Sequence, residues 1–98
     1  MKYKDLIETI QIVAKYNGGL EKECYEMWAE HDEHGINIKD ASKVSAEDIR
    51  RLAEIGWQLG CDADYDEEDS EKWENYKNLS DEELVELFSK YDGIYKYE

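Results

Sequence analysis

Apolar residues at helical spacing, in segments that begin or end at recognisable capping residues, are the feature that most constrains the fold of this chain. The first such segment covers residues 4–16, where one face collects five apolar residues: Leu6, Ile7, Ile10, Val13 and Ala14. Recurrence every three to four residues is the period of an α-helix. Asn17, Gly18 and Gly19 follow, and both residue types accept the left-handed backbone of a helix C-terminus. We therefore predict a helix over residues 4–16.

A second segment with the same period covers residues 20–34, and we predict a helix there as well. Its apolar face consists of Leu20, Cys24, Met27, Trp28 and His31, and Gly35 ends it. Residues 36–44 follow as a connector, with a short extended piece at residues 36–38.

The third helix is predicted to begin at Ser45. Ser45 followed by Asp48 approximates a capping box, in which a hydroxyl and an acid each accept from a backbone N–H. The buried face expected after it consists of Ile49, Leu52, Ala53, Gly56 and Leu59. Of the two glycines here, Gly56 is interpreted as a close-packing position and Gly60 as a C-cap. Further on, Trp73 and Tyr76 indicate a short helix that packs the preceding acidic segment against the core.

The last helix has the clearest start. Ser80 and Glu83 form a regular capping box. The core face then consists of Leu84, Leu87, Phe88 and Tyr91. Asp92 and Gly93 end the helix, and the tail 94–98 is either a short strand or a frayed end.

Together these segments predict a mainly α fold, a compact bundle of four or five short helices with a short extended C-terminal piece. Residues 1–98 are expected to form a single domain, because no proline, repeat or linker divides the chain. A hydrophobic share of 41%, with three Trp and eight Tyr, supplies enough apolar area for a modest core.

Negative charge is the strongest functional signal in the composition. The 26 Asp and Glu residues outnumber 12 Lys and Arg, for a formal net charge of -14. Residues 61–98 hold 14 acids and 4 bases, so they carry -10 of that charge. Such a chain repels phosphate backbones and anionic lipid and attracts basic surfaces. We therefore do not expect direct binding to nucleic acid or to membranes. We expect a protein partner with a basic surface.

Two groups of acids are the predicted partner-binding residues. The first is a run in which only Lys72 offsets eight acids: Asp62, Asp64, Asp66, Glu67, Glu68, Asp69, Glu71 and Glu74. The second is a stripe at helical spacing along residues 20–34: Glu23, Glu26, Glu30 and Glu33. Members of such a stripe lie about 5 Å apart, a scale comparable with the roughly 3.4 Å rise between DNA phosphates. A rigid protein with such carboxylates suits a groove that binds nucleic acid. The other interpretation is a solvated acidic face with no partner, which keeps the protein in solution.

Metal and catalytic sites are not predicted. His31 and His34, with Cys24 and Cys61, lack the close ligand pairs of zinc sites, and both histidines suit structural roles. The segment from Asp62 to Asp66 opens like a calcium loop, but Glu67 replaces the glycine of position six and Trp73 the glutamate of position twelve. Cys24 and His31 are too far apart on one helix to form a nucleophile–base pair, and no glycine-rich phosphate loop is present. We expect a non-enzymatic protein without a cofactor.

Cysteine usage and hydropathy predict a location. Two cysteines are too few for the disulfide framework of a small secreted domain, which indicates a reducing compartment. No segment approaches the roughly 18 apolar residues of a membrane span. The expected location is cytoplasmic.

In size and charge the chain resembles the small acidic inhibitors that phages use against host defence, particularly anti-CRISPR proteins. The acidic run 62–74, the stripe 23–33 and the capped helices around them carry the resemblance. It implies a binding inhibitor that docks an acidic, nucleic-acid-mimicking face on a subunit of a CRISPR effector complex, in a bacterial host cell. Two alternatives stay open: an immunity protein that neutralises a basic nuclease toxin, and a small helical adaptor.

Overall fold

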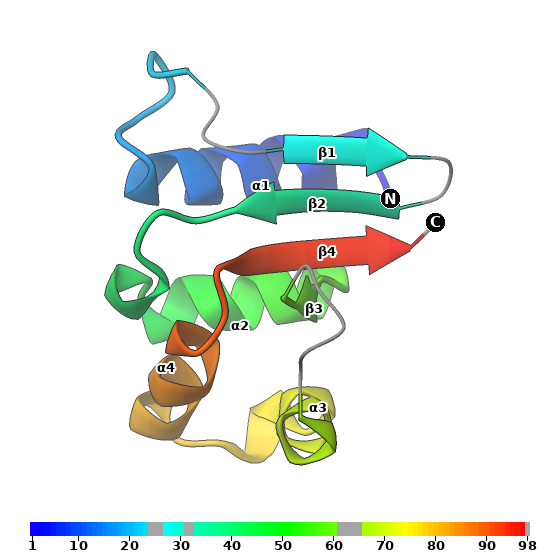
Figure 1. Ribbon diagram of the computed structural model, residues 1–98, viewed down its shortest axis with the longest axis vertical. Coiled ribbons are helices and arrows are strands. Elements are labelled where there is room, and N and C mark those ends of the chain that lie inside the picture. Colours follow the sequence, from blue (N-terminus) through cyan, green and yellow to red (C-terminus); the bar gives the residue numbers. More distant parts are fainter. Residues whose placement is uncertain (24–26, 31–32, 61–65, 98) are drawn as a thin grey trace.

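A computed structural model describes residues 1–23, 27–30, 33–60 and 66–97. Within these residues the chain forms four α-helices and one antiparallel sheet (Figure 1). The helices are α1 (Tyr3–Tyr16), α2 (Ala46–Ile55), α3 (Glu67–Glu74) and α4 (Asp81–Ser89). The strands are β1 (Met27–Glu30), β2 (Glu33–Asn37), β3 (Gln58–Leu59) and β4 (Gly93–Tyr97). Two short 3-10 helices, Ala41–Lys43 and Tyr76–Asn78, precede α2 and α4.

The sheet has the strand order β1-β2-β4-β3, so the C-terminal strand lies in its interior. Ile36 of β2 lies opposite Ile94 of β4, which in turn lies opposite Leu59 of β3. All three side chains are buried. In Figure 1, α1 lies behind β1 and β2, and α3 and α4 lie together at the opposite end of the molecule.

The mainly helical character is confirmed, but the helices pack with a four-stranded sheet and do not form the predicted bundle. The interpretation of residues 20–34 as a helix is wrong. Residues 27–30 and 33–37 are the two strands of a hairpin, with Trp28 opposite Gly35. Gly35 also lies opposite Tyr95 of β4, and it is buried between these neighbours. Strand β2 forms its backbone hydrogen bonds with β4, which lies more than fifty residues further along the chain. Such tertiary pairing overrides a local helical period. The tail predicted as a strand or a frayed end is this strand, β4.

Helix α1 has the predicted bounds but a different buried face. Thr9, Ile12 and Val13 are buried, whereas Ile7 and Ile10 are 56% and 39% exposed. The polar Thr9 is completely buried because its hydroxyl accepts a 2.9 Å hydrogen bond from the Nε1 of Trp57. It also donates to the backbone oxygen of Asp5 at 2.8 Å. A polar side chain thus joins Ile12 and Val13 in attaching α1 to the core.

The starts of the remaining helices are confirmed, but two helix ends and the roles of two glycines are not. Helix α2 ends at Ile55, so Leu59, predicted on its buried face, lies in β3, and α4 ends at Ser89, before Tyr91. Ser45 begins α2 by accepting from the Asp48 backbone N–H, and Ile49 and Leu52 are buried. Gly56, with φ of 113°, ends α2 as a left-handed C-cap, a role that was expected at Gly60. The last helix begins with the predicted capping box and buries Leu84, Leu87 and Phe88.

None of the helices in the described part of the chain is long and apolar enough to cross a membrane.

Candidate functional site: an acidic end on α3 and α4

Helix α3 is held in place at both of its ends. Asp66 is its N-cap and accepts a 3.1 Å hydrogen bond from the backbone N–H of Glu68. Near its other end, the Nε1 of Trp73 donates to the backbone oxygen of Trp57 at 2.9 Å. Trp73 is 5% exposed, and its ring packs near that of Phe88. The predicted short helix that packs the acidic segment against the core is therefore confirmed for residues 67–74.

One of the predicted binding residues, Asp69, is instead part of this attachment. Asp69 is only 6% exposed. Its carboxylate accepts a 2.8 Å hydrogen bond from the hydroxyl of Tyr91 and lies 3.4 Å from the Nζ of Lys90. Burial, together with the hydrogen bond to Asp69, raises the pKa of Tyr91 to about 12. Asp69 thus joins α3 to the end of α4 and is not available to a partner.

Helix α4 is fixed beside α3 by its cap and by one arginine. The capping box is complete, because Ser80 and Glu83 each accept from the other's backbone N–H. That hydrogen bond from the Ser80 backbone lowers the pKa of Glu83. From α2, the Arg50 guanidinium donates to the backbone oxygens of Tyr76 and Leu79 at 2.9 and 2.7 Å. The same guanidinium forms a 3.0 Å ion pair with Asp81.

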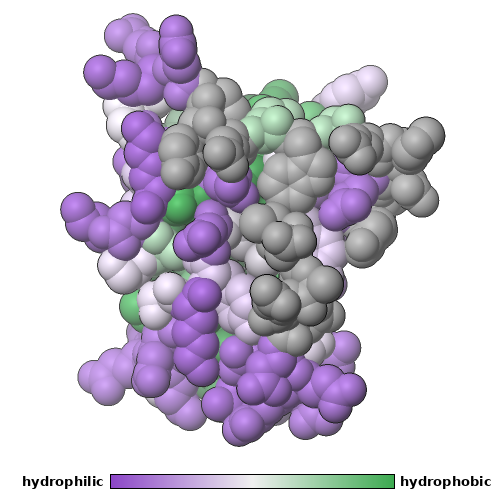
Figure 2. Space-filling view, in the orientation of Figure 1, coloured by the Kyte–Doolittle hydropathy of each residue, from purple (hydrophilic) through white to green (hydrophobic). Residues whose placement is uncertain are grey.

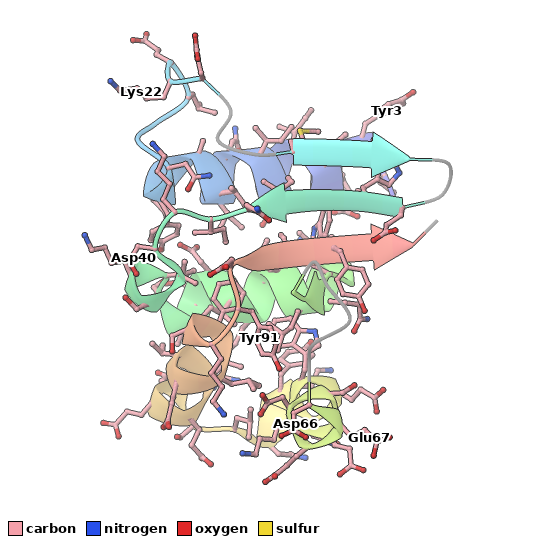
Figure 3. The ribbon with its side chains drawn as sticks, in the orientation of Figure 1. Tyr3, Lys22, Asp40, Asp66, Glu67 and Tyr91 are labelled. Atoms are coloured by element: carbon pink, nitrogen blue, oxygen red, sulfur yellow. The ribbon has the colours of Figure 1, made fainter. Side chains whose placement is uncertain are left out.

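The two helices together expose nine carboxylates, which we call the acidic end. Its members are Asp66, Glu67, Glu68, Glu71, Glu74, Asp81, Glu82, Glu83 and Glu86. Figure 2 shows hydrophilic residues covering the end of the molecule where α3 and α4 lie. Figure 3 shows Glu67 pointing away from the body of the protein at the start of α3.

Residues 66–90 contain three lysines, Lys72, Lys77 and Lys90, and two of them lie close to carboxylates. The Nζ of Lys72 lies 3.7 Å from Glu68, and Lys90 lies 3.4 Å from Asp69. A shallow hollow of about 120 Å³ between α3 and α4 is lined by both lysines and by Glu83 and Glu86. The acidic end therefore carries a clear excess of negative charge that these lysines offset only in part.

The second predicted group of binding residues does not form a stripe. Glu23 lies in the loop before β1 and is exposed. The backbones of Glu30 and Glu33 are the last register pair of the β1–β2 hairpin. Glu26 lies outside the described residues. The correction follows from the fold, because a strand hairpin cannot align residues at the 3.6-residue period. Of the acidic run, Asp62 and Asp64 also lie outside the described residues.

Sequence reasoning left the four acids of α4 out of the site: Asp81, Glu82, Glu83 and Glu86. The sequence did indicate a helix here that begins with a capping box and has three acids in its first turn. What the sequence did not show was that α4 lies next to α3.

The described residues contain no group of three or more His, Cys, Asp and Glu side chains that could hold a metal ion. Asp66, the fifth position of the calcium-like segment, is the N-cap of α3. His34 lies in β2 opposite Lys96. Cys24, His31 and Cys61 lie outside the described residues.

Comparisons of the chain with protein-family models, with curated proteins and with solved structures find no match.

Proposed function

We propose that the protein is a non-enzymatic binding inhibitor that docks its acidic end on a basic, nucleic-acid-binding surface of a bacterial defence complex. In this proposal it is an anti-CRISPR type of protein, and the carboxylates occupy positions that nucleic-acid phosphates would take. The observation that carries the proposal is the clustering of nine exposed carboxylates on two adjacent helices.

Rigid attachment of these helices supports the proposal. Binding costs less when the groups that make the contact are already ordered. Trp73 fixes α3 through Trp57, the buried Asp69 joins it to Tyr91, and Arg50 fixes the turn before α4. Five exposed carboxylates of the acidic end take no part in these contacts or in the helix caps: Glu67, Glu71, Glu74, Glu82 and Glu86. Attraction between unlike charges also speeds encounter and weakens as salt rises.

The test is target-DNA binding by purified CRISPR effector complexes, measured at low salt with and without the protein. Wild-type protein is expected to lower DNA binding by a complex that it inhibits. The triple variant Glu71→Lys, Glu74→Lys and Glu86→Lys should weaken that inhibition at least about tenfold. This follows because each exposed pair contributes roughly 0.2–1 kcal/mol and reversal adds repulsion. All three residues are exposed and have no role in a helix cap.

A matched control separates a specific surface from total charge. The variant Glu21→Lys, Glu23→Lys and Glu47→Lys makes the same change in net charge at exposed positions outside the acidic end. It should inhibit nearly as well as the wild type. An equal loss of inhibition in both triple variants would mean that only the overall charge of the protein matters. A wild-type protein that leaves DNA binding unchanged in every complex tested contradicts the anti-CRISPR assignment, and the same variants then test a basic nuclease as the partner.

A further inference from the structure

Helix α1 carries a second apolar stripe beside its buried face, and three of its four residues are exposed. Tyr3, Ile7, Ile10 and Ala14 are spaced by four, three and four residues, which places them along one side of the helix. Tyr3 is 87%, Ile7 56% and Ile10 39% exposed. This alternation of three and four is the spacing by which two helices pack along a common seam. The inward face of α1 is different and consists of Thr9, Ile12 and Val13.

Exposed apolar side chains gather at this one edge of the fold, which we call the apolar edge. Among the described residues, the large hydrophobic side chains that are exposed are Met1, Tyr3, Ile7, Ile10, Leu20 and Met27. All of them lie on α1, on its flanking segments or on β1. An exposed apolar patch of this kind marks an interaction site more often than scattered single residues do.

Strand β1 forms the sheet's side of the same edge. It is the outermost strand of the order β1-β2-β4-β3, and within the described chain it pairs with β2 alone. Two hollows, of about 270 and 140 Å³, lie between α1 and the sheet, and both are lined by Met27 and Ile36. Among the described residues, the contact between α1 and the sheet thus leaves two hollows beside Met27 of β1. Figure 1 shows α1 and β1 together at the end of the molecule opposite α3 and α4.

We propose that the apolar edge binds a second copy of this chain about a two-fold axis. Such an axis places β1 antiparallel to its counterpart and α1 against the other α1, so the sheet and the helix layer both continue across the interface. Isologous contacts of this kind are self-complementary, because each residue meets the same patch of the other copy. A strand edge with an apolar helix stripe beside it supplies both elements that this arrangement needs.

The charge distribution opposes pairing at this edge less than pairing through the acidic end. Residues 1–37, which include α1 and the β1–β2 hairpin, contain eight acids and four bases, for a net charge of -4, whereas residues 61–98 carry -10. The acidic end lies at the far end of a molecule 33 Å long. Pairing through α1 and β1 thus brings together the less acidic parts of two chains that each carry a formal charge of -14. It leaves both acidic ends outside the interface, where like charges are well separated and screened.

Sedimentation equilibrium tests this proposal on the full chain. At about 100 µM, where even a micromolar interface is filled, the wild type should have twice the monomer mass of 11.6 kDa. Ile7→Lys, in the helix layer, and Met27→Lys, in the strand layer, should each raise the dimer dissociation constant about a hundredfold. The two-fold axis places two lysines in the interface per substitution, which doubles the desolvation cost. Both residues are more than half exposed, so each variant should keep the circular dichroism of the wild type.

Gln58→Lys is the control, since Gln58 is exposed on β3, the strand at the opposite edge of the sheet. It should leave the dimer intact. A monomeric wild type overturns the proposal, as does a dimer that survives both Ile7→Lys and Met27→Lys, or one that Gln58→Lys dissociates. Moderate salt should strengthen this contact between two acidic chains and weaken the contact of the acidic end with a basic partner. The two interactions are thereby distinguishable.

Discussion

The buried carboxylate of Asp69 gives the sharpest test of how α3 is held. Removing it by Asp69→Ala deletes the acceptor of the 2.8 Å hydrogen bond from the Tyr91 hydroxyl. The sequence alone places Asp69 among the binding acids. In the structure it is a packing residue, so the substitution should reduce stability and leave the exposed carboxylates of the acidic end unchanged.

The expected size of the effect follows from the contact. A hydrogen bond to a charged group contributes about 1.5–3 kcal/mol to stability. Tyr91 is partly exposed, so water replaces some of what is lost and a value near the lower limit applies. The ion pair with Lys90 adds little, because that lysine is 50% exposed and 3.4 Å away. We therefore expect a loss of about 1.5–2 kcal/mol, or roughly 6–16 °C in Tm for a domain of this size.

Urea and thermal unfolding of four proteins measure this loss and assign it: wild type, Asp69→Ala, Tyr91→Phe and the double variant. Residues that share a hydrogen bond have coupling energies of about 0.5–3 kcal/mol in such a cycle. Here we expect about 1–2 kcal/mol, because the double variant loses the bond only once. Glu71→Ala, an exposed acid of the same helix, is the control and should change stability by less than about 0.5 kcal/mol.

The reasoning would be refuted by an Asp69→Ala protein as stable as Glu71→Ala, or by a coupling energy close to zero. In either case Asp69 would not hold α3 in place. It would then return to the set of candidate binding residues.

Three further outcomes are expected. Thr9→Val should lower stability by about 1–3 kcal/mol in urea unfolding, because the buried Nε1 of Trp57 loses its acceptor; an unchanged midpoint would show that water replaces the hydroxyl. Ile94→Ala should cost about 2–5 kcal/mol, because Ile94 is fully buried in the central strand, whereas Ile7→Ala on the exposed side of α1 should cost much less. In the folded protein the pKa of Tyr91 is raised from 10.0 to about 12, so its contribution to stability is complete below pH 10 and is lost as the pH rises towards 12. Tyr91→Phe should flatten the fall in stability between pH 10 and 12. An equally steep fall in both proteins would contradict the raised pKa.

Elements that depend on neighbouring residues were predictable from the sequence. The starts of α2 and α4 are such elements, since a hydroxyl at Ser45 or Ser80 caps N–H groups only three residues away. Trp73 also indicated correctly that the acidic segment is packed against the core. The two caps act within one helical turn, and the Trp73 prediction needed only the apolar character of its side chain.

The sheet was not predictable in this way, because its partners are distant in sequence. Residues 20–34 have an apolar period compatible with a helix, but residues 27–30 and 33–37 form a hairpin. The second strand of that hairpin pairs with β4, where Ile36 lies opposite Ile94, 58 residues further on. The helical interpretation therefore aligned Glu23, Glu26, Glu30 and Glu33 on one face. In the structure Glu23 lies before β1, and Glu30 and Glu33 are on the two strands of the hairpin. The same limit applies to Thr9, whose burial depends on Trp57.

Position within the helices divides the acidic end into charges that the fold itself favours and charges that it does not. Glu67 and Glu68 in α3, and Asp81, Glu82 and Glu83 in α4, stand in first turns, where the helix dipole stabilises negative charge. Glu71, Glu74 and Glu86 lie beyond the first turns, and in the described part of the chain none of the three forms an ion pair. Clustered like charges without such compensation destabilise a fold by repulsion. These three carboxylates have no structural explanation of their own, and a basic partner would give them one. Reversing them tests function with the least disturbance to the helices that carry them.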